Sequence, residues 1–415
     1  MIILCPDCGS AQTLPALAPL HRAVCHRCGA ELARGGQARI QALLAATVTA
    51  LLLYFPATFL PILIVEYNGQ MRQNIIATGA GALWDQGYWT LATGVFLLTV
   101  AMPMAWLSSL FAVLLTLASG RHPAWLGPLM RLCQSCRPWA MPEIMLLGGF
   151  VAYSRVEAMA TTSIGAGGWS YLFYAAAVLA IDLVHDRHAL WERVLPTPSI
   201  TQPIGAFACH TCRYPIEPDC AETARRCVCP RCRGTTGARK EDAFNQCAAL
   251  VVTAAILYIP ANLLPVMTVL NFGERTPNTI LSGIGELWDE GVWPLAIIVF
   301  IASLAVPLLK LLGLSWCLAM ILRRSGSQLV ARTRLVRLIS FIGRWSNIDV
   351  FTISILCVLA NFGNLEQVEV DPGAVCFAAV VILTMIASHR FDIRMMWDAI
   401  EPETEPTGVH DSVIL

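Results

Sequence analysis

Charged residues are scarce in this sequence. They make up 13% of its 415 residues, about half of the roughly 25% that is usual in soluble proteins. Lys and Arg total 28 and balance 28 Asp and Glu, so the chain lacks the basic surplus that indicates binding to nucleic acid. Hydrophobic residues instead make up 56%, which indicates a membrane protein.

Catalytic motifs are also absent. The sequence contains no G-x-S-x-G, no G-x-x-x-x-G-K-[ST] and no H-E-x-x-H, so we predict no catalytic residues, no ATP hydrolysis and no enzymatic activity. The chain begins with a cysteine cluster and not with an apolar signal sequence. We therefore expect the N-terminus in the cytoplasm.

The sequence is a tandem duplication with an offset of 204 residues. Cys5, Cys8, Cys25 and Cys28 return as Cys209, Cys212, Cys229 and Cys232. The same offset relates many Pro, Gly and Trp positions in the apolar stretches that follow. Each repeat therefore joins a cysteine cluster to a hydrophobic block.

Each cysteine quartet has the spacing of a zinc ribbon. In the pattern Cys-x2-Cys-x16-Cys-x2-Cys, two short turns bring four thiolates together, which predicts a tetrahedral site for Zn²⁺. With four protein ligands and no open position, both sites are expected to be structural. A redox pair and an iron centre with the same ligands are the alternatives.

Four further cysteines do not fit the repeat. Cys133 and Cys136 form a third C-x-x-C without a mate in the second repeat, and Cys220 and Cys227 lie inside the second ribbon. Cys227 precedes Cys229 by two residues and is a possible substitute ligand. We interpret all four as reduced thiols without a function.

Hydropathy predicts eight transmembrane helices, four in each repeat, because a span needs about 20 apolar residues. The predicted spans are Arg39–Val65, Trp89–Ala118, Trp139–Ser154, Trp169–Val184, Ala243–Leu270, Trp293–Leu322, Trp345–Phe362 and Pro372–Ala387. The fold class is thus an all-α polytopic membrane protein. The semi-polar segments 66–88 and 271–292 each end in Leu-Trp-Asp-x-Gly-x-Trp, which indicates a short interfacial helix or an ordinary aromatic belt.

Arginine sets the predicted orientation. The loops 121–137 and 323–344 contain Arg and no acidic residue, whereas the loop after the fifth span contains Glu274, Glu286 and Asp289. Short loops rich in Lys and Arg remain in the cytoplasm. Both termini and both cysteine clusters are therefore expected there.

Lys310 is the residue of interest inside the membrane. It lies 13 residues before Arg323, about 20 Å along a helix, which is too deep for its ammonium group to reach the interface easily. Charges at such depth usually face a cavity or a partner, although a purely structural pair is the alternative. Its repeat mate is Trp106.

Three polar residues are candidate companions of Lys310 in a polar cavity. Ser303 lies on the same helical face, seven residues earlier, and Thr384 lies in the last span. Asp182 ends the fourth span, where it is equally an ordinary interfacial acid. Glu143 and Asp349 occupy the first turns of their helices, where acids stabilise the helix dipole.

The ordered motifs resemble those of the paraquat-inducible protein A family. The resemblance rests on the paired ribbons, on the Pro-x4-Pro elements Pro56/Pro61 and Pro260/Pro265, and on the Leu-Trp-Asp-x-Gly-x-Trp segments, and it covers nearly the whole chain. It implies a bacterial inner-membrane protein with zinc-binding ribbons and tetraspanin-like four-helix modules. It also implies a periplasmic MCE-domain partner that forms a tunnel for lipid.

We expect five parts along the chain: a first zinc ribbon (1–37), a first four-helix module (38–195), a second ribbon (205–240), a second module (241–400) and a disordered tail (401–415). The leading hypothesis for function is transfer of phospholipid to or from the tunnel, with Lys310 near the headgroup phosphate and proton coupling through Asp182 as a looser suggestion. A membrane scaffold that anchors an envelope complex and a membrane thiol oxidoreductase are the alternatives. The ordered quartets count against the oxidoreductase, and the buried Lys310 counts against the scaffold.

Overall fold

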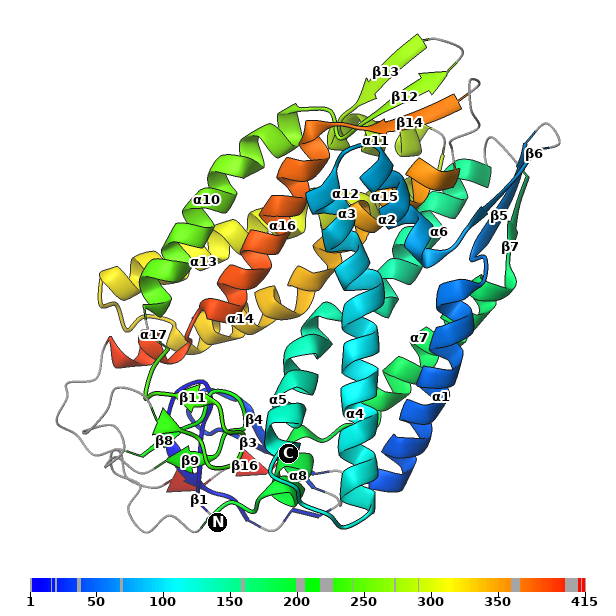
Figure 1. Cartoon of the computed structure of the whole chain (residues 1–415). Helices are drawn as coiled ribbons and strands as arrows, with labels where there is room; N and C mark the ends of the chain where they lie inside the picture. Colours follow the sequence, from blue (N-terminus) through cyan, green and yellow to red (C-terminus); the bar gives the residue numbers. More distant parts are fainter. Residues whose placement is uncertain are drawn as a thin grey trace.

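The apolar stretches of both repeats fold into helices that run between two ends of the molecule (Figure 1). The computed structural model describes residues 2–15, 17–18, 21–35, 39–67, 70–157, 161–198, 206–216, 227–240, 242–271, 274–289, 291–359, 366–399, 410–411 and 413–414. Both cysteine clusters lie at one end, here called the ribbon end, and two small sheets lie at the other, the sheet end.

Module one contains the helices of the first repeat. They are α1 (Ile40–Phe59), α2 (Ile76–Asp85), α3 (Trp89–Phe96), the π-helix η1 (Leu97–Ala101), α4 (Met102–Ala118), α5 (Leu126–Cys136), the 3₁₀-helix η2 (Arg137–Trp139), α6 (Pro142–Glu157), α7 (Ala166–Val184) and α8 (Arg187–Val194). Its sheet joins β5 (Leu63–Tyr67), β6 (Gln70–Asn74) and β7 (Thr161–Ile164) in the order β6-β5-β7.

Module two repeats this arrangement. Its helices are α10 (Ala243–Leu263), α11 (Ile280–Asp289), α12 (Trp293–Phe300), the π-helix η3 (Ile301–Ala305), α13 (Val306–Leu322), α14 (Leu329–Ile342), the 3₁₀-helix η4 (Gly343–Asn347), α15 (Ile348–Leu359), α16 (Pro372–Arg390) and α17 (Arg394–Asp398). Its sheet joins β12 (Met267–Asn271), β13 (Glu274–Asn278) and β14 (Glu366–Val370) in the order β13-β12-β14.

Six helices within the described residues are long and apolar enough to cross a membrane. They are α1, the continuous segment Trp89–Ala118, α7, α10, the continuous segment Trp293–Leu322 and α16. The third and seventh predicted spans correspond to α6 and α15, which have 16 and 12 residues. At 1.5 Å per residue both are shorter than the roughly 30 Å hydrocarbon core. These two helices pack against each other between the modules.

A tyrosine stabilises the π-helix in each module. The hydroxyl of Tyr54 donates a hydrogen bond of 2.7 Å to the carbonyl oxygen of Val100, and Tyr258 donates one of 3.2 Å to that of Leu304. In each case the π-turn directly precedes α4 or α13, whose second residue is proline. Because proline lacks an N–H and π-turns displace the hydrogen-bond ladder, a side-chain donor at this place satisfies a carbonyl inside the apolar bundle.

The sheets at the sheet end were not predicted by hydropathy. Segments 66–88 and 271–292 contain the expected short helices, α2 and α11, but each is preceded by a hairpin. A third strand, which precedes the last long helix of the module, pairs with the first strand of this hairpin. The helical modules therefore each include a three-stranded antiparallel sheet.

Each ribbon is built from two short hairpins. The first ribbon contains β1 (Ile2–Leu4), β2 (Ala11–Thr13), β3 (Arg22–Val24) and β4 (Glu31–Arg34). The second contains β8 (Phe207–Ala208), β9 (Pro215–Ile216), β10 (Cys227–Val228) and β11 (Thr235–Thr236).

Four residues of the C-terminal stretch also form strands. β15 (His410–Asp411) pairs parallel to β2, and β16 (Val413–Ile414) pairs antiparallel to β3, so both extend the first ribbon. The prediction of a disordered tail does not hold for these four residues. The rest of 401–415 lies outside the described residues.

The first ribbon docks on module two, although it precedes module one in the sequence. Arg337 of α14 forms an ion pair with Asp7, Arg394 donates a hydrogen bond of 2.9 Å to the carbonyl of Pro6, and Arg27 stacks 4.7 Å from the Trp397 ring. The second ribbon instead packs on α5 and α8 of module one. The two ribbons thereby bridge the modules at the ribbon end.

Candidate metal centres and polar cavity

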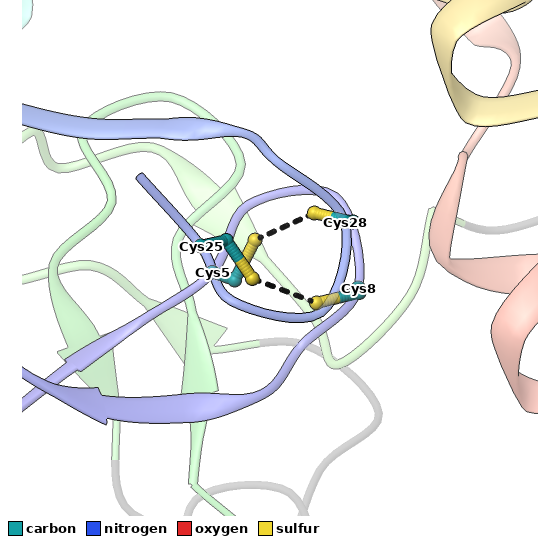
Figure 2. A group of neighbouring side chains, drawn as sticks. All are labelled: Cys5, Cys8, Cys25 and Cys28. Atoms are coloured by element: carbon teal, nitrogen blue, oxygen red, sulfur yellow. Dashed lines mark hydrogen bonds between the residues drawn. The ribbon is translucent and has the colours of Figure 1, made fainter. Parts of the chain in front are cut away.

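The first cysteine quartet forms a compact, buried cluster of four sulfur atoms (Figure 2). The Sγ atoms of Cys5 and Cys28 lie 3.5 Å apart, and those of Cys8 and Cys25 lie 3.6 Å apart. A tetrahedral Zn–S site with bonds of about 2.3 Å places its sulfurs about 3.8 Å apart. The cluster thus has nearly the dimensions of such a site.

The second quartet has the same geometry. The Sγ atoms of Cys209 and Cys232 lie 3.7 Å apart, and those of Cys212 and Cys229 lie 3.4 Å apart. All four sulfurs lie within 4.8 Å of one another, as in the first ribbon. Cys227 is disulfide-bonded and is not a member of the cluster, so the prediction of a reduced thiol and the alternative of a substitute ligand are both wrong for this residue. Cys220 lies outside the described residues.

Tight turns present the cysteines. The N–H of Gly9 donates to the carbonyl of Cys5 and that of Gly29 to the carbonyl of Cys25, and both glycines have positive φ angles of 76° and 68°. Their mates in the second ribbon are Arg213 and Arg233, with φ angles of 60° and 54°. This left-handed conformation costs a non-glycine residue roughly 1–2 kcal/mol, so the second ribbon maintains a strained turn.

Two side chains donate hydrogen bonds to sulfurs of the first cluster. The Gln12 Nε2 atom lies 2.7 Å from Cys25 Sγ, and the Arg337 Nη2 atom lies 3.4 Å from Cys28 Sγ. Four thiolates around a divalent cation carry a net charge of −2, which such donors stabilise. Buried all-sulfur ligands fit Zn²⁺ or iron and exclude Mg²⁺ and Ca²⁺, which require oxygen ligands.

The remaining C-x-x-C pair is separate from both clusters. Cys133 and Cys136 are buried on α5 and free of disulfide bonds. Burial raises the pKa of the Cys133 thiol to about 12, so it remains protonated. A protonated, buried thiol is a poor nucleophile, which argues against a redox role for this pair.

Lys310 is enclosed where α13, η4 and α16 meet. Its side chain is 1% exposed, and its Nζ atom donates hydrogen bonds of 3.1 Å to Ser346 Oγ and 3.3 Å to Thr384 Oγ1. A Cβ atom at Gly343 would lie 2.6 Å from Lys310 Cε, so a larger residue there would displace the end of the lysine side chain. Among the described side chains, Lys310 has no ion-pair partner.

A cavity of about 420 Å³ lies beside Lys310, between the two modules. Its walls include Trp106, Gln134, Arg137, Asp182, His185, Arg187, Lys310, Gly343, Met385 and His389. Lys310 and its repeat mate Trp106 therefore line the same space. Both amide atoms of Gln134 are buried without a hydrogen-bond partner among the described residues, so this polar side chain is available to a molecule in the cavity.

The structure unites only part of the polar set that the sequence suggested. Thr384 contacts Lys310 as expected. Asp182 lines the cavity but forms an ion pair with Arg137, whose guanidinium stacks 4.8 Å from the Trp106 ring. Ser303 is buried and its hydroxyl has no partner among the described residues, and it does not line the cavity. Sequence reasoning missed Ser346, because no pattern marks it in the segment Trp345-Ser346-Asn347.

A histidine that lines the cavity is held neutral. His185 directly follows α7, outside the long apolar helix, and burial lowers the pKa of its imidazole below the usual value of about 6.5. The nearby Arg187 acts in the same direction and Asp182 opposes it. At neutral pH His185 therefore adds no positive charge to the cavity.

The two modules match one known family. A family model described as "Paraquat-inducible protein A" matches residues 40–194 and 244–401. The chain belongs to the paraquat-inducible protein A family. The duplicated match agrees with the repeat in the sequence, and family membership confirms the resemblance inferred from the motifs.

Curated relatives of this family are named as transport proteins. "Intermembrane transport protein PqiA" of Escherichia coli (strain K12) is 32% identical over 414 residues, which cover 97% of each chain. "Lipophilic envelope-spanning tunnel protein A" of the same strain is 31% identical over 400 residues, which cover 96% of this chain and 91% of the relative. A "Probable intermembrane transport protein" of Haemophilus influenzae is 25% identical over 97% of both chains. No solved structure matches the chain.

Proposed function

We propose that this paraquat-inducible protein A family member is the inner-membrane subunit of a lipid transport system. It passes phospholipid to or from a periplasmic MCE-domain tunnel through the cavity beside Lys310. The names of its relatives supply the class of function, since they describe intermembrane transport and a lipophilic tunnel. Phospholipid and the MCE-domain partner are our inferences.

One observation supports this proposal above the others: a fully buried lysine without a carboxylate partner among the described side chains, beside a cavity. Placing an unpaired charge inside the bundle costs a few kcal/mol on insertion scales. A scaffold that moves no cargo has no use for such a charge. An anionic phosphate in the cavity would compensate that charge. Ser346 and Thr384 orient the ammonium group, and Arg137 and Arg187 add positive charge at the cavity wall.

Asp182 and Ser303 have lesser parts in the proposal. Asp182 is fixed by Arg137, so proton coupling through it requires that this ion pair opens. Ser303 is buried in the π-helix η3 and has no direct part in the cavity.

The ribbons are proposed to bind one structural zinc ion each, through the eight clustered cysteines. The expected division into ribbons 1–37 and 205–240, modules 38–195 and 241–400 and tail 401–415 is retained as part of the proposal. Eight membrane crossings, with α6 and α15 as the short ones, place both termini and the ribbon end in the cytoplasm. The arginine-rich loops on that end support this orientation.

The function is tested by replacing Lys310 with Met and measuring envelope integrity in a strain that lacks its own family members, with immunoblots for abundance. We expect loss of complementation at normal abundance, because Met fills a similar volume without the charge. Lys240→Met is the matched control, since Lys240 is the only other lysine of the chain and does not line the cavity. Full complementation by Lys310→Met would refute the proposal and favour the scaffold.

The orientation is tested with single added cysteines and a membrane-impermeant maleimide applied to intact cells without an outer membrane. Ser327→Cys on the arginine-rich loop should remain unlabelled until the cells are lysed, and Arg275→Cys at the sheet end should react at once. Both positions are exposed. The reverse pattern would refute the proposed topology.

A further inference from the structure

A second cavity, of about 130 Å³, lies between α3 of module one and the η4–α15 and α16 segments of module two. Most of its lining is apolar, including Leu91, Leu98, Val350, Ala378 and Ile382. Thr90 also lines it and is exposed, so the cavity reaches the outer surface of the bundle on α3. It does not share a charged residue with the Lys310 cavity.

Asn347 divides the two cavities. It lines the apolar cavity and is 2% exposed. Its Nδ2 atom donates hydrogen bonds to the Sδ atoms of Met141 and Met385, each at 3.4 Å. Met385 in turn lines the Lys310 cavity. One layer of side chains therefore separates a cationic space from an apolar one.

The two contacts between Asn347 and the methionines are weak. A thioether sulfur is a weak hydrogen-bond acceptor, and methionine has three rotatable bonds and adapts to irregular space. A rotation of Met385 is the side-chain movement that would be needed to join the two cavities. The joined space would have cations at one end and apolar walls at the other, which matches an amphiphile with an anionic head and an acyl chain.

We propose that the apolar cavity is the acyl-chain site of the phospholipid whose phosphate lies beside Lys310, and that Asn347 with Met141 and Met385 is the partition that its chain displaces. This inference rests on the proposed function, since it takes phospholipid as the cargo. Apolar cavities of about 150 Å³ bind a molecule the size of benzene. The closed cavity therefore accommodates one short segment of a chain, and the rest of the chain occupies the space opened by Met385 or emerges beside Thr90.

Gly94 provides a direct way to fill this site. It lines the cavity, and a Cβ atom built on it would meet nothing within 4 Å. Gly94→Leu therefore adds a side chain at the wall of the cavity, where its Cβ atom meets no neighbour, and leucine favours the helix more than glycine does. Thr93→Leu is the matched control, because Thr93 precedes it on α3, is exposed and does not line the cavity.

The test uses the full-length protein in nanodiscs that contain phosphatidylethanolamine with a diazirine in one acyl chain. After illumination, mass spectrometry identifies the labelled peptides. We expect labelling of α3, α15 and α16 residues around the cavity, a loss of at least fivefold in Gly94→Leu, and none in Thr93→Leu. Asn347→Ala should extend the labelling to the peptide that contains Met385.

Unchanged labelling in Gly94→Leu, or labelling confined to the outer surface of the helices, would overturn the inference. Equal labelling by a photoreactive free fatty acid would replace phospholipid by fatty acid as the ligand. The inference and the function fail separately. If Lys310→Met complements while Gly94→Leu still abolishes labelling, the chain site stands without the proposed transport role. If the wild-type protein shows no labelling around the apolar cavity, the acyl-chain site is refuted, whatever the result for Lys310→Met.

Discussion

Thr352 of α15 donates a hydrogen bond of 3.3 Å to the carbonyl oxygen of Gly148 of α6. These two helices occupy the same place in their modules and pack against each other. The two modules therefore meet along α6 and α15. The Lys310 cavity and the apolar cavity also lie between the modules.

Close packing between α6 and α15 is expected to disfavour a side chain at Gly148. A Cβ atom there would lie 3.2 Å from Phe351 Cβ and 3.3 Å from the carbonyl oxygen of Ile348, whereas at Gly149 the nearest atom, on Ile355, is 3.9 Å away. Gly148→Val should cost about 1–3 kcal/mol by overpacking and lower the melting temperature in detergent. Gly149→Val is the control, and an equal effect of both would show that helix propensity, not packing, is responsible.

The purified protein is expected to contain two zinc ions per chain, measured by elemental analysis. Cys209→Ser should remove one ion and lower abundance, because metal binding stabilises a ribbon that has almost no core of its own. Cys133→Ser should leave the metal content unchanged, since Cys133 is buried but belongs to neither cluster. Iron in place of zinc, or oxidised cysteines without metal, would contradict this prediction.

Arg337 is expected to slow the loss of metal from the first ribbon. It pairs with Asp7 and donates to the sulfur and the carbonyl of Cys28. Loss of such a supporting hydrogen bond typically lowers metal affinity by about 10–100-fold, so Arg337→Gln should release one of the two ions faster to a chelator with a chromogenic readout. Arg334→Gln, on an exposed position of the same helix, should release metal as the wild type does. Identical rates for both variants would show that Arg337 only tethers the ribbon.

Acid is expected to destabilise the ribbon end through His185. Because burial holds its pKa below that of the unfolded chain, the unfolded state binds the proton more readily. Its contribution to stability is complete above about pH 6.5 and is lost as the pH falls through the lower folded pKa. His185→Asn should reduce the drop in melting temperature between about pH 7.5 and 5. If the melting temperature of His185→Asn drops as much as that of the wild type, groups other than His185 cause the drop.

The sequence allowed the parts with strong local patterns to be predicted. The quartet spacing of Cys5 to Cys28 gave the sulfur clusters, and long apolar runs such as Trp293–Leu322 gave the six long helices. Both signals are local, since turn chemistry and hydropathy act within a few residues or one helix. The depth of Lys310 in its helix likewise indicated burial before any partner was known.

The remainder depends on contacts between distant segments. Strands such as Gln70–Asn74 are short and polar and resemble loops until β5 pairs with them. Ser346 reaches Lys310 only because η4 packs on α13 and α16, and nothing near Ser346 in the sequence indicates it. Asn347 belongs to the same class: its importance comes from two methionines 206 and 38 residues away.

The strands β15 and β16 have a consequence for biosynthesis. The first ribbon leaves the ribosome before any other part of this sequence, yet the partners of β2 and β3 are residues 410–414. Until translation reaches them, both strands expose unpaired edges that are prone to aggregate or to pair wrongly. Removal of residues 410–414 would therefore leave these edges of the first ribbon without their partners.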